Sequence, residues 1–141
     1  MDRKGSALWK GTLKEGKGTV STESGTLKDA PYSFTSRFEN GAGTNPEELL
    51  GAAHAGCFSM ALSGQLAGEK LTAESIATTA TVTVEKVEGG FGITHIHLAC
   101  EARIAGTDQA TFERLAGVAK AGCPVSKLFN TRITMDAKLV G

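Results

Sequence analysis

The chain has 141 residues, 40% of them hydrophobic, and its 15 basic side chains balance its 15 acidic ones to a formal net charge of +0. This size and composition indicate one globular domain over residues 1–141, and they exclude a disordered or fibrous chain. A neutral chain has no surplus of cationic groups to displace counterions from nucleic acid or to hold an anionic membrane, so we expect neither partner.

The first residues contain no apolar run of the kind that a secretory signal needs, so a cytoplasmic location is expected. The three cysteines, Cys57, Cys100 and Cys123, are too few and too widely spaced for a disulfide scaffold or a four-cysteine zinc site. Core packing, metal binding and redox chemistry remain open for them.

Short alternating runs separated by turn residues predict three strands in the first third of the chain, over residues 6–11, 17–24 and 31–38. In the third strand the aromatic residues, Phe34 and Phe38 among them, share one parity and Arg37 has the other. Arg37 is therefore predicted to project from the face opposite the aromatic rings.

The segment Leu49–Gly68 has twenty residues and no charged side chain, about the length that crosses a bilayer. It is mostly Gly, Ala and Ser, too weakly hydrophobic for a lone span, so we interpret it as a soluble helix buried on nearly all sides. Thr44 or Asn45 is the expected cap, Pro46 suits the first turn, and Glu47 stands at capping-box spacing from Thr44. Covering such a helix takes a second copy of the chain, which favours a homodimer with the helices packed inside shared sheets.

Residues 76–85 and 96–104 predict a hairpin around a Glu-Gly-Gly turn, with alternate residues from Ile96 to Ile104 forming an apolar face. Asp108 is the expected cap of a second helix that ends at Gly122 in a left-handed conformation. Cys123 is the expected cap of a short helix that begins at Pro124 and ends near Asn130, before a last strand over residues 132–139. The resulting order, βββ-α-ββ-αα-β, indicates an α+β fold with antiparallel sheets.

The cysteines differ in the chemistry that their positions favour. Cys100 stands on an apolar strand face, where burial disfavours the thiolate, so core packing is expected. Cys57 lies in mid-helix and needs an activating charge from elsewhere, which leaves packing and reactivity open. Cys123 caps a helix, where nearby N–H groups favour thiolate, although a plain cap residue is an equal alternative. The pairs His54/Cys57 and His95/His97 lack a third ligand at a recognisable spacing, so no metal site is expected.

Three segments carry a specific resemblance: Phe34-Thr35-Ser36-Arg37-Phe38, residues 43–62 around His54-Ala55-Gly56-Cys57, and Ala119 through Gly122-Cys123-Pro124-Val125-Ser126. Together they resemble the OsmC/Ohr family of thiol peroxidases over essentially the whole chain. They are most similar to the OsmC branch, osmotically inducible protein C, because His54 and residues 59–62 flank Cys57 as they do there.

The resemblance implies an intertwined homodimer in which sheets from both chains wrap two central helices. It also implies reduction of organic hydroperoxides, and of hydrogen peroxide less well, in the response to oxidative and osmotic stress. Cys57 would become a sulfenic acid, Cys123 would resolve it as a disulfide, and Arg37 and Glu47 would form the activating pair. A dithiol reductant of unspecified identity would regenerate the thiols, and no cofactor is implied.

Two geometric conditions follow from these roles. The sulfurs of Cys57 and Cys123 must meet, and Glu47 must contact Arg37 rather than Cys57, because a carboxylate beside a thiolate opposes it. An apolar substrate tail is expected to lie against aromatic and Met side chains near the motifs: Phe34, Phe38, Phe58, Met60 and Phe129. The alternatives are a non-catalytic stress-induced protein that binds a small molecule in this pocket and, more remotely, a metal-dependent hydrolase.

Overall fold

The computed structural model describes residues 1–141, which form two compact units, an N-terminal unit of Met1–Leu49 and a C-terminal unit of Leu50–Gly141. The elements follow the order βββ-αα-ββ-αα-β. The predicted α+β class and element order are therefore confirmed, with one additional short helix before the long one. The expectation of one domain over the whole chain stays a prediction.

The N-terminal unit is built on a three-stranded antiparallel sheet in the order β1-β2-β3. Its strands are β1 (Gly5–Lys10), β2 (Lys17–Thr22) and β3 (Ala30–Ser33). Trp9 and Tyr32 lie across β2 with ring centroids 5.3 Å apart. Glycine is needed between them, because a Cβ at Gly18 would collide with both rings. This aromatic pair forms one wall of the hollow described for this unit below.

The third strand is shorter than predicted, because β3 stops at Ser33 and helix α1 (Phe34–Phe38) follows. The Ser33 hydroxyl accepts from the N–H of Ser36, and the Ser36 hydroxyl accepts from the N–H of Ser33, which makes a capping box. The strand predicted over residues 31–38 is therefore wrong in its second half. The face assigned to Arg37 is wrong as well, since the guanidinium carbon lies 5.0 Å from the centroid of the Phe38 ring.

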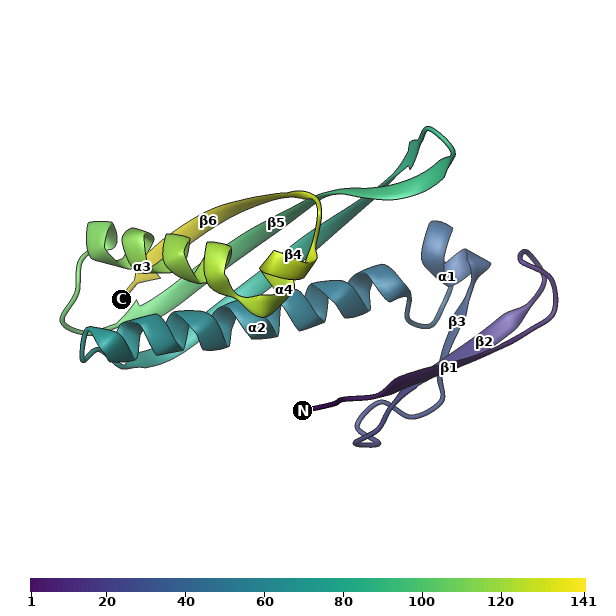
Figure 1. Ribbon diagram of the computed structural model, residues 1–141, viewed down its shortest axis with the longest axis horizontal. Coiled ribbons are helices and arrows are strands. Elements are labelled where there is room, and N and C mark those ends of the chain that lie inside the picture. Colours follow the sequence, from purple (N-terminus) through teal and green to yellow (C-terminus); the bar gives the residue numbers. More distant parts are fainter. The chain divides into compact units, whose positions relative to one another are not determined.

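The C-terminal unit holds a second sheet in the order β4-β5-β6, made by β4 (Ala73–Val87), β5 (Gly90–Ile104) and β6 (Arg132–Val140). β4 and β5 form the predicted hairpin and continue as a two-stranded ribbon beyond the part that pairs with β6 (Figure 1). β6 lies parallel to β5, which corrects the expectation of purely antiparallel sheets. The reason is the long helical connection between these strands, since a crossover of that length returns the chain in the same direction.

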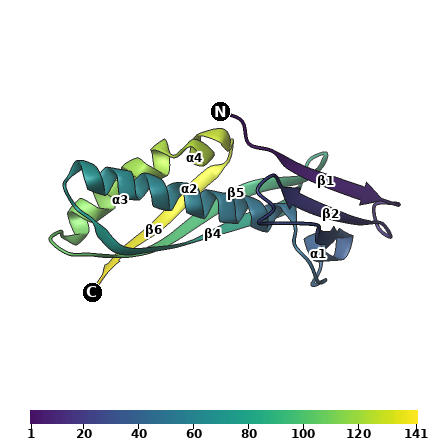
Figure 2. The same cartoon turned by 90° about the horizontal axis from the view of Figure 1, so that it is seen from below.

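Two helices, α2 (Pro46–Gly68) and α3 (Gln109–Gly122), cover one face of the second sheet, as Figures 1 and 2 both show. The predicted apolar face of β5 is confirmed and points at these helices. The core joins α2, β5 and α3 through buried side chains: Phe58, Leu62, Leu66, Leu98, Cys100, Ala102, Ile104, Phe112, Leu115, Ala116, Ala119 and Cys123. Each large side chain buried here stabilises the fold by about 1.5–3 kcal/mol.

Only one side of α2 is buried within this chain. His54, Phe58, Leu62 and Leu66 follow one another at helical spacing and are fully buried. The opposite side carries small and uncharged residues that are exposed: Ala52, Ala53, Gly56, Met60, Ser63, Gly64 and Ala67. The prediction of a helix buried on nearly all sides is therefore wrong for a single chain. No helix of this chain has both the length and the apolar character that crossing a bilayer requires.

The helix ends agree in part with the sequence. Asn45 is the cap of α2, since its Oδ1 accepts from the N–H of Glu48 at 2.8 Å, and Asp108 caps α3 as predicted. α2 ends at Gly68 as expected, while the left-handed residue is Lys70. Gly122 is the last residue of α3 and has no positive φ, so the left-handed stop predicted there is wrong.

Candidate functional site

Cys57 and Cys123 meet in the C-terminal unit. Cys57 is half-buried near the middle of α2, and Cys123 is fully buried where α3 ends. The Cys57 thiol lies beside both the Cys123 thiol and the backbone of Val125, close enough for each of them to act on its pKa. The structure places the two thiols next to each other, no disulfide joins them, and their joint role in catalysis stays a prediction.

The surroundings of Cys57 within this unit favour the neutral thiol. Burial raises the pKa of Cys57, the backbone hydrogen bond at Val125 lowers it, and the neighbouring Cys123 thiol raises it again. Burial is the largest of these effects, so the balance is a raised pKa. A nucleophilic role for Cys57 therefore requires a cation from outside these contacts.

Cys123 owes its position to the start of helix α4 (Pro124–Leu128), which Pro124 opens with a backbone already suited to a first turn. The Cys123 sulfur accepts from the N–H of Ser126 at 3.3 Å, so Cys123 is the helix cap that the sequence predicted. The helix ends at Leu128, somewhat before the predicted Asn130. This turn holds the Cys123 sulfur against α2.

A buried polar chain extends from Cys123 to His54. The Cys123 thiol donates to the Ser126 hydroxyl at 3.1 Å, and that hydroxyl lies 2.7 Å from Nε2 of His54. His54 is fully buried and is hydrogen-bonded through Nε2, whereas its Nδ1 is buried without a partner. Sequence reasoning did not assign Ser126 a role, although its hydroxyl stands three residues after Cys123 in the Cys-Pro-Val-Ser motif.

Arg37 and Glu47 form an ion pair in the N-terminal unit. The Nε of Arg37 donates to both carboxylate oxygens, at 3.0 and 3.2 Å, and Nη2 donates to Oε1 at 2.7 Å. The Glu47 side chain is only 11% exposed, while that of Arg37 is 41% exposed. The carboxylate thus orients the guanidinium and leaves part of it open, which meets the condition that Glu47 contact Arg37.

The turn between α1 and α2 brings these two residues together. The Ser36 hydroxyl donates to the carbonyl of Thr44, and the Asn45 side chain donates to the carbonyl of Ser36. These bonds hold α1 against the first turn of α2. The capping box predicted between Thr44 and Glu47 is wrong, because the Thr44 hydroxyl bonds to Glu48 instead. Glu47 is therefore free to bind Arg37.

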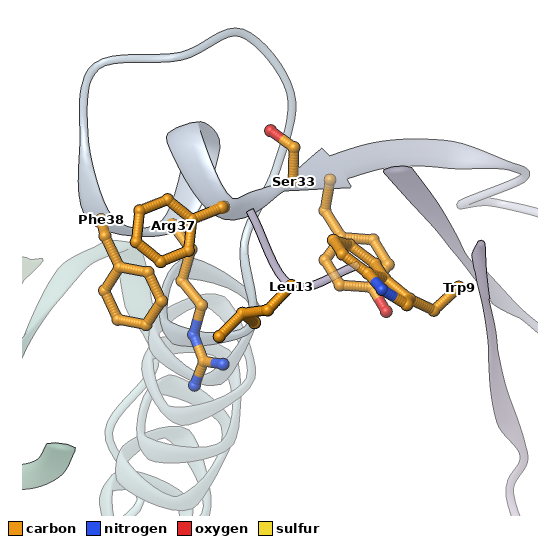
Figure 3. A pocket seen from close by; sticks show the side chains of 7 residues that line it. Trp9, Leu13, Ser33, Arg37 and Phe38 are labelled. Atoms are coloured by element: carbon orange, nitrogen blue, oxygen red, sulfur yellow. The ribbon is translucent and has the colours of Figure 1, made fainter. Parts of the chain in front are cut away.

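An apolar hollow of about 260 Å³ lies beside Arg37 in the same unit. Figure 3 shows the side chains of Leu13, Arg37 and Phe38 pointing toward this hollow, with Trp9 across from them. Its lining residues are Trp9, Leu13, Tyr32, Ser33, Phe34, Arg37 and Phe38. A long cationic side chain at the rim of an apolar hollow suits a small molecule with one polar end.

The predicted apolar wall is thus correct at two of its five positions. Phe34 and Phe38 line the hollow, but Phe58 is fully buried in the core of the C-terminal unit and Met60 is 79% exposed. Phe129 packs edge-on against the His54 ring, with centroids 5.4 Å apart. The sequence could not reveal Trp9 and Leu13, because the sheet and a turn bring them to α1.

The remaining candidates lie apart from these groups. Cys100 is buried on β5, where burial raises the pKa of its thiol, as expected for a packing role. His95 and His97 share the hydroxyl of Thr134, at 2.7 and 2.6 Å, on the other face of the sheet. No three metal-ligating side chains gather anywhere in the chain.

Two functional sets therefore emerge, one in each unit. The C-terminal unit brings two thiols into contact, an arrangement suited to forming a disulfide after one sulfur is oxidised. The N-terminal unit holds an oriented guanidinium at an apolar hollow, an arrangement suited to an anion or to developing negative charge on oxygen.

Comparison with known proteins gives consistent matches. The sequence model described as OsmC-like protein matches residues 39–138. The chain is 55% identical over 139 residues to the peroxiredoxin OsmC of Escherichia coli, covering 99% of this chain and 97% of that protein. It is 36% identical over 102 residues to the organic hydroperoxide resistance protein of Xanthomonas axonopodis, covering 70% and 67% of the two chains.

The fold is also similar to that of solved structures. An OsmC-like protein of unknown function from Vibrio cholerae superposes with a TM-score of 0.77, covering 97% of this chain and 99% of that one. The two sequences are 17% identical, so this likeness concerns the fold alone.

Proposed function

The chain belongs to the OsmC-like protein family, and from that premise we propose that it is a thiol-dependent hydroperoxide reductase. The observation that carries the proposal is the proximity of the Cys57 and Cys123 thiols within one unit, where each is free. It is supported by the relatives, which include a peroxiredoxin and an organic hydroperoxide resistance protein.

The reaction has three steps. The Cys57 thiolate attacks the terminal oxygen of the hydroperoxide, the O–O bond breaks, and the leaving alkoxide takes a proton to become an alcohol. The Cys123 sulfur then attacks the sulfur of the Cys57 sulfenic acid, forming a disulfide and releasing water. A dithiol reductant restores both thiols by exchange. Cys57 is the better choice for the first step because it is partly exposed, whereas Cys123 is fully buried.

Arg37 supplies the activating cation in this proposal, oriented by Glu47. Cys57 needs one, because burial and the neighbouring thiol raise its pKa. A guanidinium with a free edge stabilises both the thiolate and the negative charge that develops on the peroxide oxygen. The bidentate contact with Glu47 holds that edge in one direction.

Organic hydroperoxides are the proposed substrate class. The hollow beside Arg37 is lined mostly by aromatic and aliphatic side chains. Each CH₂ group that a substrate buries there contributes about 0.8 kcal/mol, which hydrogen peroxide cannot gain. A non-catalytic protein that merely retains a small molecule in this hollow is the second candidate, favoured by the same apolar lining.

A homodimer in the cytoplasm is proposed as the working form. The uncharged outer face of α2 carries Gly56 and Gly64, where an added Cβ would meet nothing within 4 Å, and the side chain of Met60 is 79% exposed. Small residues let a second helix approach closely, so a second copy of this helix is the proposed cover. A disulfide that is formed and reduced in each cycle suits a reducing compartment with dithiol reductants.

The test is a single turnover of the reduced protein with one equivalent of tert-butyl hydroperoxide, followed by alkylation and mass spectrometry. We expect one Cys57–Cys123 disulfide per chain in the parent, a trapped sulfenic acid in Cys123→Ser, and no peroxide consumption in Cys57→Ser. Cys100→Ser is the matched control and should behave as the parent. Peroxide consumption by Cys57→Ser, or retention of the hydroperoxide without turnover by the parent, would reject the peroxidase in favour of a binding protein.

A further inference from the structure

The resolving thiol Cys123 is buried among groups that connect it to a base. Its sulfur has two polar side-chain partners, the Cys57 thiol and the Ser126 hydroxyl. The Ser126 hydroxyl in turn contacts Nε2 of His54 at 2.7 Å. Within the C-terminal unit, the polar side chains that extend from Cys123 away from Cys57 are those of Ser126 and His54.

The direction of the hydrogen bonds defines the proton positions. Because the Cys123 thiol donates to the Ser126 oxygen, the Ser126 proton is free to point at His54. The His54 tautomer that accepts this proton has its lone pair on Nε2 and its ring proton on Nδ1. The chain of hydrogen bonds from Cys123 through Ser126 thus ends at Nε2 of His54, a nitrogen that can accept a proton.

His54 is held in its neutral, basic form. It is fully buried, the Phe129 ring packs against its edge, and burial lowers the pKa of the imidazole. The lowered pKa comes from burial of the ring. The titratable groups in its surroundings are the thiols Cys57 and Cys123, with Cys100 in the same buried core. A buried ring nitrogen without a partner, here Nδ1, is uncommon in a purely structural histidine.

We propose that Ser126 and His54 form a proton relay that activates Cys123 for resolution of the Cys57 sulfenic acid, an inference that rests on the proposed peroxidase function. Ser126 touches the reacting sulfur, and His54 is a positioning residue that acts through Ser126. An ordinary thiol is only a few per cent ionised near neutral pH, so a base beside the resolving thiol accelerates this step.

The step balances without a further reactant. The Cys123 proton moves to the Ser126 oxygen while the Ser126 proton moves to Nε2 of His54. The Cys123 sulfur attacks the Cys57 sulfur, the S–S bond forms, and the S–O bond breaks. The leaving hydroxide takes up one proton and becomes water, and His54 gives up the proton that it received, so the number of protons is unchanged. His54 and Cys57 are three residues apart on α2, so they occupy neighbouring positions on the helix surface.

The experiment resolves the two chemical steps by rapid mixing of reduced protein with one equivalent of tert-butyl hydroperoxide. Peroxide loss reports oxidation of Cys57, and dimedone trapping against disulfide formation reports resolution. His54→Gln keeps a hydrogen-bonding group near Ser126 but has no base, and Ser126→Ala breaks the chain independently. We expect both variants to slow resolution about tenfold or more, and far more than they slow peroxide loss.

The pH dependence separates a relay from a structural role. In His54→Gln hydroxide from solvent takes over from the missing base, so the deficit relative to the parent should shrink as the pH rises. Ser126→Thr keeps the hydroxyl and should recover most of the rate. Ser59→Ala is the matched control, because it removes a similar hydroxyl contact, with Thr78 at 2.8 Å, that does not reach Cys123.

Each outcome has one meaning. Resolution at the parent rate in either folded variant, or a deficit that is the same at every pH, overturns the relay. Absence of peroxide loss in the parent overturns the peroxidase function itself, which keeps the two failures distinct. If one variant does not fold, the other still tests the proton relay at a different residue.

Discussion

Replacement of Gly64 by leucine tests whether the outer face of α2 is the contact between two copies of the chain. Gly64 is exposed on that face, and a Cβ built there has no neighbour within 4 Å. Within one chain the change removes a poor helix former, which stabilises the helix by about 0.8 kcal/mol. A monomeric protein would therefore become slightly more stable.

The effect of Gly64→Leu on stability changes from favourable to unfavourable if two α2 helices pack through this glycine. Each dimer then receives two extra leucine side chains at a close contact, and overpacking costs about 1–3 kcal/mol per side chain. The expected loss of about 2–6 kcal/mol in the free energy of association raises the dissociation constant of the dimer by about 30-fold or more. Gly117→Leu is the matched control, since Gly117 lies in α3 and an added Cβ there also meets nothing within 4 Å.

Sedimentation velocity over a concentration series measures the dissociation constant, and thermal unfolding at matched concentrations measures stability. We expect Gly64→Leu to dissociate and to melt earlier, and Gly117→Leu to remain associated. An unchanged dimer in Gly64→Leu would show that another surface joins the chains. A parent protein that stays monomeric at every concentration would remove the dimer from the proposal.

Three further outcomes are expected. Arg37→Ala should slow peroxide consumption by about 100-fold and raise the pH midpoint of Cys57 alkylation, and Glu47→Gln should do the same more mildly. Glu48→Gln is the control, because Glu48 bonds to Thr44 rather than to a cation. Equal rates of peroxide consumption in all three variants would contradict the roles assigned to Arg37 and Glu47. Leu13→Ser should lower the preference for alkyl hydroperoxide over hydrogen peroxide about tenfold by removing apolar contact equivalent to about two CH₂ groups, measured as a ratio of kcat/KM values. The free energy of unfolding should fall as the pH drops below 6.5, the ordinary pKa of histidine, because His54 takes up a proton in the unfolded chain and stays neutral when buried. Urea titrations should show a shallower fall of this free energy in His54→Gln. An identical fall in the variant would show that another group causes the pH dependence.

The local structure was largely readable from the sequence. The β4–β5 hairpin follows from strict alternation and a glycine turn, and the caps at Asp108 and Cys123 follow from side chains placed just before a helix. These features depend on neighbours in the chain, where sterics and short hydrogen bonds decide the conformation. The specific motifs around Cys57 and Cys123 likewise identified the protein family.

Errors arose where the pattern used for a prediction competed with a different hydrogen-bonded or packing contact. Alternation predicted a strand through Phe38, but the Ser33–Ser36 capping box converts that segment into a helical turn and brings Arg37 over the Phe38 ring. Spacing suggested that Glu47 caps a helix, yet the bonds from Ser36 to the start of α2 hold Arg37 against Glu47. The parallel pairing of β6 is set by a helical crossover, which alternation within a strand does not encode.

Residue types and their periodicity by themselves determined the α+β class and the element order, and the resemblance of the motifs to the OsmC/Ohr family gave the pairs Cys57/Cys123 and Arg37/Glu47 as candidates. Only the tertiary structure decided that the two thiols lie next to each other, that Ser126 and His54 extend from Cys123, and that Trp9 and Leu13 line the hollow beside Arg37. The physical reason is range: helix and strand patterns are set by residues a few positions apart. The Ser126–His54 contact joins positions 72 residues apart, and packing of the sheet and helices alone brings them together.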